Sequence, residues 1–304
     1  MQLSLGSLLF FWDRERVYNF YRDMIEQPVD IIYLGESVCS KRRELKTAEW
    51  IELGQELAQS GKEPGKAAGK QIVLSSLALI EAESELKTLR RLCDNGELMI
   101  EANDIGAVQL MAERKLPFVA GTSINIYNAR TLKNLYDNGM RRWVMPVELS
   151  GKALADILTD AQSMGIGDEL ETEVFSYGLM PLAYSARCFT ARARNLPKDR
   201  CQYVCLEYPD GLPMSSQEDQ EVFTINGIQT LSGQTYNLLP ELDEMKRIGV
   251  DIVRLSPQGE EMASVIKQFR DQLDGNSNQI PIIPQDAVNG YWYDDAGLVN
   301  THQS

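Results

Sequence analysis

The chain has 304 residues, of which 43% are hydrophobic, and 44 acidic residues outnumber 30 Lys and Arg residues, for a net charge of −14. This length and composition suit one large globular domain with a sizeable core, or two small ones. The acidic balance argues against a protein that binds the phosphate backbone of nucleic acids. We therefore expect no nucleic acid partner. No apolar run approaches the roughly eighteen residues of a membrane-spanning helix, so we also expect no transmembrane segment.

The apolar run at residues 3–12 follows no basic segment and precedes no small-residue cleavage site. We therefore interpret it as a first strand rather than a targeting signal, and we expect a cytoplasmic protein. Disulfides are uncommon in the cytoplasm. The five cysteines are accordingly interpreted as metal ligands or redox groups rather than as cross-links.

Short apolar runs alternate with helical patterns along the chain. Strands are expected at residues 3–10, 30–34, 71–75, 97–102, 118–121, 142–147, 171–177 and 251–255. Helical spacing is found at residues 14–26, 47–60, 81–93, 129–138, 151–164 and 260–273. Eight strands that alternate with helices predict parallel βαβ units, and a (β/α)8 TIM-like barrel is the leading fold. An open, doubly wound α/β sheet is the alternative.

The domain organisation follows from this pattern. We expect a single α/β barrel domain over residues 1–276, irregular in one part, and a C-terminal extension over 277–304. The irregular part is residues 178–244, a cysteine-bearing insertion after strand seven, in which the polar stretch 209–234 has room for a small hairpin.

Three of the five cysteines lie in that insertion, with the spacing C-x12-C-x3-C at Cys188, Cys201 and Cys205. Grouped thiolates are typical of a metal site, and a closed site needs a fourth ligand. In a barrel, the loops that follow the strands meet at one rim, so Cys39, just after strand two, can reach the other three. Cys93 lies on an amphipathic helix and is interpreted as a packed residue. One close pair and two solitary cysteines favour a cubane iron–sulfur cluster, and zinc remains the alternative.

Polar residues at predicted strand ends are candidates for contact with a substrate. We single out four of them as tentative substrate-binding residues: Glu36, Asn125, Glu173 and Arg254. His302 is the only histidine and lies near the end of the sequence, which argues against Ser-His-Asp or Cys-His catalysis. The sequence identifies no catalytic residue.

Two motifs and a third segment connect these residues to a known family. The sequence resembles the collagenase-like peptidases (peptidase U thirty-two) in three places. These are Gly35-Glu36-Ser37-Val38-Cys39, Glu173-Val174-Phe175-Ser176-Tyr177-Gly178 and the segment that ends at Cys188. Many members have a cysteine where this chain has Pro181. The branch that this chain resembles has a ligand near the second strand instead, which matches Cys39.

This resemblance, rather than the spacing, implies a [4Fe-4S] cluster held by Cys39, Cys188, Cys201 and Cys205. It implies oxygen-independent hydroxylation of the ubiquinone precursor ring, a prenylated aromatic quinone precursor. The implied partners are a UbiU-like family member, as a heterodimer, and a lipid-carrier-like accessory protein. Two alternatives remain: an RNA-base hydroxylase with the same chemistry, and a noncatalytic structural subunit. A working peptidase is not expected, because no histidine is placed to serve as a base.

Overall fold

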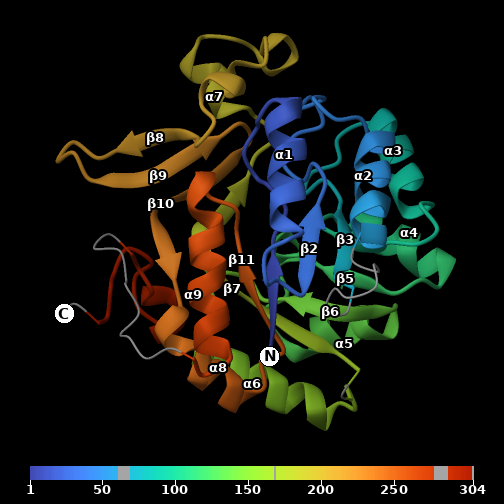
Figure 1. Ribbon diagram of the computed structural model, residues 1–304, viewed down its shortest axis with the longest axis vertical. Helices are drawn as coiled ribbons and strands as arrows, with labels where there is room; N and C mark the ends of the chain where they lie inside the picture. The colour runs from blue at the N-terminus through green and yellow to red at the C-terminus, as the bar shows by residue number, and fades with distance from the viewer. Residues whose placement is uncertain (61–68, 168, 277–286, 303–304) are drawn as a thin grey trace.

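A computed structural model describes residues 1–60, 69–167, 169–276 and 287–302. Its centre is a closed barrel of eight parallel strands (Figure 1). The barrel strands are β1 (Gln2–Leu5), β2 (Ile31–Leu34), β3 (Gln71–Ser75), β4 (Met99–Ala102), β5 (Phe118–Ala120), β6 (Met140–Val144), β7 (Glu171–Tyr184) and β11 (Ile252–Leu255). Each pairs with the next in this order, and β11 pairs with both β7 and β1. This closure confirms the predicted TIM-like barrel and excludes the open sheet.

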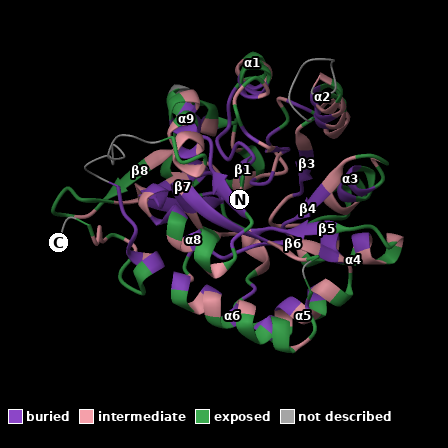
Figure 2. Cartoon of the chain, turned by 60° about the horizontal axis from the view of Figure 1, so that its bottom comes forward, coloured by how far each residue is buried: buried purple, intermediate pink, exposed green. Residues whose placement is uncertain are grey.

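Helices surround the barrel, and the strands are largely buried inside this ring (Figure 2). The helices are α1 (Arg14–Met24), α2 (Thr47–Ser60), α3 (Glu83–Cys93), α4 (Ile105–Arg114), α5 (Ala129–Asp137), α6 (Gly151–Ser163), α8 (Leu242–Ile248) and α9 (Met262–Leu273). Several begin at a side-chain cap, such as Asp13 before α1, Asn128 before α5 and Ser150 before α6. These caps satisfy amide groups that a helix start leaves free.

The first strand is shorter than predicted. It ends at Leu5, whereas the sequence predicted a strand over residues 3–10, although Leu8, Leu9 and Phe10 are buried. These residues form a connection whose backbone bonds to the loop after β2 and to the insertion instead of to a neighbouring strand. Leu9 O accepts from Arg42 Nη1 at 2.7 Å and from Asn226 Nδ2 at 2.8 Å. A continuous apolar run indicates burial, and burial alone does not distinguish a strand from a packed loop.

The seventh strand is longer than predicted and leads out of the barrel. Its outer part pairs antiparallel with β10 (Gln229–Asn237), which continues the sheet to β9 (Glu221–Asn226) and β8 (Leu212–Ser215). This confirms the predicted hairpin in the insertion. Between β7 and β8 the chain forms α7 (Phe189–Ala193), η2 (Lys198–Arg200) and η3 (Val204–Glu207). This segment projects beyond the barrel, where Figure 1 labels α7.

Residues 287–302 pack against the start of α8. The buried carboxylate of Glu241 accepts from Asn289 Nδ2 at 3.1 Å and bonds to His302 Nε2 at 2.7 Å, and Trp292 Nε1 donates to Glu244 at 2.9 Å. Short turns η4 (Leu239–Glu241), η5 (Gly259–Glu261) and η6 (Gly290–Tyr293) complete this region, and η1 (Thr122–Ile124) follows β5. Of the C-terminal extension predicted over 277–304, residues 277–286 and 303–304 lie outside the described residues.

Candidate metal centre

Four cysteines from two distant parts of the sequence line one cavity. Cys39 lies in the loop after β2, Cys188 caps the N-terminus of α7, and Cys201 and Cys205 lie at η2 and η3. Cys188 is buried and the other three are half-buried, and all four are free thiols. Cys93 instead packs in the hydrophobic core on α3. The arrangement therefore offers four soft sulfur donors at one place.

The loop that carries Cys39 is held by its own side chains. The carboxylate of Glu36 accepts from the backbone N–H groups of Val38 at 2.8 Å and Cys39 at 3.0 Å. Gly35 begins the loop with φ +131°, and a Cβ there would lie 2.6 Å from the carbonyl oxygen of Ser75. Only glycine meets both demands, so Gly35 and Glu36 together set the position of Cys39.

A strained turn joins Cys201 to Cys205. Gln202 and Tyr203 both have left-handed backbone conformations, with φ of 51° and 56°. Each such residue costs on the order of 1–3 kcal/mol when it is not glycine, and this strain is commonly found at ligand sites. At Cys188, the sulfur accepts from Ala191 N at 3.4 Å, which fixes the side chain at the start of α7.

Arg42 places a buried positive charge beside the thiols. Its guanidinium donates to Leu9 O and to Asn226 Oδ1 at 2.6 Å, and lies 3.9 Å from the Glu36 carboxylate. Burial raises the pKa of Cys205, and Arg42 counteracts this rise. Burial likewise raises the pKa of Cys39 to about 11, so this thiol is protonated at neutral pH and loses its proton when it binds a metal.

Thiol groups are the donors that both zinc and iron–sulfur clusters use. Among the described residues, no three His, Cys, Asp or Glu side chains converge on one point where a metal ion could bind. A cubane cluster does not need such convergence, because each thiolate binds a different iron atom. Thiolates are the usual ligands of such clusters, and Arg42 offsets part of their charge.

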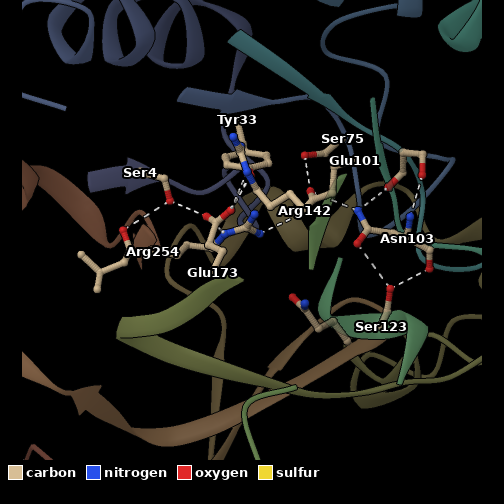
Figure 3. Close-up of polar contacts among 12 residues, drawn as sticks. Ser4, Tyr33, Ser75, Glu101, Asn103, Ser123, Arg142, Glu173 and Arg254 are labelled. Atoms are coloured by element: carbon tan, nitrogen blue, oxygen red, sulfur yellow. Dashed lines mark hydrogen bonds and ion pairs between the residues drawn. The ribbon is translucent and has the colours of Figure 1, made fainter. Parts of the chain in front are cut away.

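Below the rim, the barrel interior holds a buried ionic network (Figure 3). Glu173 on β7 accepts from Ser4 Oγ at 2.5 Å, Tyr33 Oη at 2.6 Å and Arg254 Nε at 2.8 Å. Arg254 also donates to Glu101 at 2.6 Å. Buried charges persist only when they are paired and hydrogen-bonded, and this network meets that condition.

Arg254 also reaches the barrel mouth. A cavity of about 30 Å³ there is lined by Arg254, Ser37, Ser256 and Tyr184, among others. Within the described ranges, Arg254 Nη2 and the hydroxyls of Ser37 and Ser256 have no hydrogen-bond partner. The volume is about that of one water molecule.

The four predicted substrate contacts do not form one site. Glu36 lies at the cysteine loop and Arg254 at the barrel mouth. Glu173 was grouped with the strand-end residues, and this is wrong, because it is the third residue of β7 and lies buried inside the barrel. Asn125 is exposed in a left-handed conformation after η1 and lines neither the cysteine cavity nor the barrel-mouth cavity.

Sequence reasoning missed Arg42 and Asn226. They have no periodic or spacing signal that points to the cysteines, since Asn226 ends β9 and reaches Arg42 only through the fold. The one available clue was that Arg42 lies three residues after Cys39. In the part of the chain that the structure describes, no helix has the length and apolarity needed to span a membrane.

Solved structures with a similar course of the chain are distant relatives at most. Thiamine phosphate pyrophosphorylase from Pyrococcus furiosus matches with 9% identity over 90% of this chain and 96% of that chain, at a TM-score of 0.46. Dihydropteroate synthase from Coxiella burnetii matches with 10% identity over 91% and 92%, at a TM-score of 0.45. These values support no conclusion about activity.

The family comparison is more informative. The model of Peptidase family U32 matches residues 18–293, which include both motifs, all four cysteines of the cavity and every barrel strand except β1. Because the match covers most of the sequence, the chain belongs to Peptidase family U32.

Proposed function

We propose that this chain is the iron–sulfur subunit of an oxygen-independent hydroxylase that acts on the ring of a ubiquinone precursor. In this proposal it is a UbiV-like member of the family. It works as a heterodimer with a UbiU-like subunit, and a lipid-carrier-like accessory protein presents the prenylated substrate.

One observation carries the proposal: four free cysteines line a single cavity, although in the sequence most of the barrel strands lie between Cys39 and the other three. Such an assembly in a reducing compartment indicates a metal cofactor more strongly than a structural role. A peptidase reaction has less support, because the only histidine, His302, is bonded to Glu241 and lines neither cavity.

Cys39, Cys188, Cys201 and Cys205 would hold the [4Fe-4S] cluster, which supplies one-electron transfer when bound. The remaining roles belong to this chain's own residues. Glu36 holds the Cys39 loop through two backbone bonds, and Arg42 supplies positive charge against the thiolates. Thr190 and Val204, both buried, help to line the cavity and limit the access of water.

The test begins with protein purified without oxygen. It is expected to be brown and to contain about four irons and four sulfides per chain. Single replacement of Cys39, Cys188, Cys201 or Cys205 by Ala should deplete the iron, whereas Cys93→Ala is the matched control and should retain it. One equivalent of zinc without visible absorption, or equal iron loss in Cys93→Ala, would contradict the proposed cluster.

The same variants test the reaction in cells that lack the chromosomal copy. Anaerobic cells should accumulate an under-hydroxylated ubiquinone precursor, and cells grown in air should make ubiquinone normally. The wild-type chain should restore anaerobic synthesis, and Cys188→Ala should not. Normal anaerobic ubiquinone in the deletion strain rules out the hydroxylase assignment, even if the cluster is present.

A further inference from the structure

A second, much larger cavity adjoins the cysteine site. It has a volume of about 960 Å³. It lies between the loops after β2 and β3, helix α3 and residues 186–199 of the insertion. Cys188, Arg42 and Lys198 line both cavities, so a molecule in the larger one lies next to a proposed cluster ligand. We call this larger cavity the side groove.

The floor of the side groove is apolar. It is formed by six side chains from α2, α3 and the two loops, namely Leu45, Trp50, Leu77, Ile80, Leu89 and Leu92. Leu77 and Ile80 remain half-buried, so they present apolar surface to the groove. Binding pockets of this size are usually lined by such residues, with a few polar groups that fix the orientation of the ligand.

The side groove carries a surplus of positive charge, because seven Lys and Arg residues line it against four Glu and Asp residues. Lys41 is paired with Asp199 at 3.2 Å, and Lys198 is paired with Glu81. Four further cations line the groove and make no ion pair with any described acid: Arg43, Lys46, Arg187 and Arg192. In a chain with a net charge of −14, such a local surplus is not a result of composition. It favours a ligand with an acidic group.

We infer that the side groove binds an aromatic ring that carries both an apolar chain and an acidic substituent. The chain lies on the floor, and the acidic group faces the cationic rim beside Cys188. This inference rests on the proposed function, because it assigns the prenylated ring to a place on this subunit. A volume of about 960 Å³ accommodates a ring with a chain of a few isoprene units.

The test measures equilibrium binding of a farnesylated hydroxybenzoate to the cluster-containing protein near neutral pH, through calorimetry and the fluorescence of Trp50 in the floor. Saturable binding at one site is expected. Leu77→Asp and Ile80→Asp should each weaken it at least roughly tenfold, because a charged group replaces apolar contact. Lys46→Glu combined with Arg187→Glu should weaken it by a similar factor.

Matched controls use exposed residues outside the groove. Arg130→Glu combined with Lys152→Glu makes the same charge change on α5 and α6, and Leu116→Asp places an acid at an exposed apolar site. These variants should bind the probe as the wild type does. The iron content and thermal unfolding of every variant show whether it has folded and retained its cluster.

Two further probes separate the parts of the inference. A farnesylated phenol without the carboxylate and a hydroxybenzoate without the chain should each bind at least roughly tenfold more weakly. Equal binding of the phenol overturns the role of the cationic rim, and equal binding of the unprenylated acid overturns the role of the floor. Failure of all probes, with the iron content and the anaerobic phenotype as proposed, overturns the site but leaves the proposed function intact.

Discussion

Glu173 is the most constrained residue of the barrel interior. Its side chain is fully buried, and its two oxygens accept from Ser4, Tyr33 and Arg254, while Arg142 lies 3.8 Å away. Burial by itself raises the pKa of this carboxyl group. The guanidinium groups of Arg254 and Arg142 outweigh that effect and hold the pKa of Glu173 below its usual value.

This leads to a prediction for Glu173→Gln, which leaves two buried guanidinium groups with less negative charge. The free energy of unfolding should fall by about 3–5 kcal/mol near neutral pH, the cost of breaking a buried ion pair. A carboxyl group with a lowered folded pKa stabilises the fold above its unfolded pKa of about 4.3. That contribution is lost as the pH falls through the folded pKa, so the wild type and the variant should converge in acid.

Denaturant unfolding at several pH values, with the cysteines in the same state throughout, measures this difference. Glu171→Gln is the matched control, since Glu171 also pairs with Arg142 but is 41% exposed in its side chain. Its loss should be smaller than that of Glu173→Gln, because water reaches the Glu171 side chain and weakens its interaction with Arg142. A difference between Glu173→Gln and the wild type that stays constant as the pH falls through the whole acidic range would show that its charge is not the cause.

At the scale of elements, the cysteine-bearing segment 186–209 contrasts with the barrel. It consists of one short helix and two 3-10 turns, and most of its residues are exposed. The cavity between the four thiols encloses only about 20 Å³, room for about one water molecule. The proposed cluster therefore requires the segment to lie farther from the Cys39 loop. Once bound, the cluster would connect the segment and the loop through iron–sulfur bonds.

The second prediction concerns cleavage of this segment by trypsin. Arg187, Arg192 and Arg200 are exposed there, so iron-free protein should be cut within residues 187–200. Cluster-loaded protein should be cut at least roughly tenfold more slowly, because cleavage requires local opening that three iron–sulfur bonds oppose. Mass spectrometry of the fragments locates the cuts, and cleavage at Arg130 on α5 serves as the internal control. Equal rates in both forms count against a cluster at these cysteines.

The elements also show what the sequence could and could not predict. Helix 47–60 and strand 71–75 were predicted to the residue, because regular periodicity and clear boundaries mark both. The path of residues 6–12 was mispredicted because a packed loop and a buried strand both appear in the sequence as a continuous apolar run. The grouping of the four cysteines in one cavity agrees with the geometry of a barrel rim. The burial of Glu173 was missed because no pattern in the sequence shows that Arg142 and Arg254 pair with it inside the barrel.

At the scale of the whole molecule, large apolar side chains remain exposed on the cysteine-bearing segment. Phe189, Tyr203 and Leu206 are 43%, 48% and 38% exposed. They flank Cys188 and Cys205, whose thiolates are readily oxidised when solvent reaches them. A partner that covers these side chains would bury apolar surface and shield the cluster in one contact.

We therefore predict a stable heterodimer with a UbiU-like subunit that buries on the order of 1,500 Å² in total. Tyr203→Glu combined with Leu206→Glu should separate the two chains and speed the loss of cluster absorbance in air. Leu116→Glu, at an exposed apolar site after α4, is the control. Light scattering after size-exclusion chromatography measures the assembly. A co-expressed pair that elutes separately at micromolar concentration, or stays together in the double variant, would refute this interface.

Barrel closure by β11 also determines when the protein can mature during its synthesis. The chain emerges from the ribosome with its N-terminal end first, so β1 and the Cys39 loop exist long before Ile252–Leu255 can pair with β1 and β7. Pairing between such distant segments is slow. The barrel therefore closes only after residues 252–255 have been made. If the proposed cluster is inserted after this closure, iron-starved cells should contain folded chains without iron.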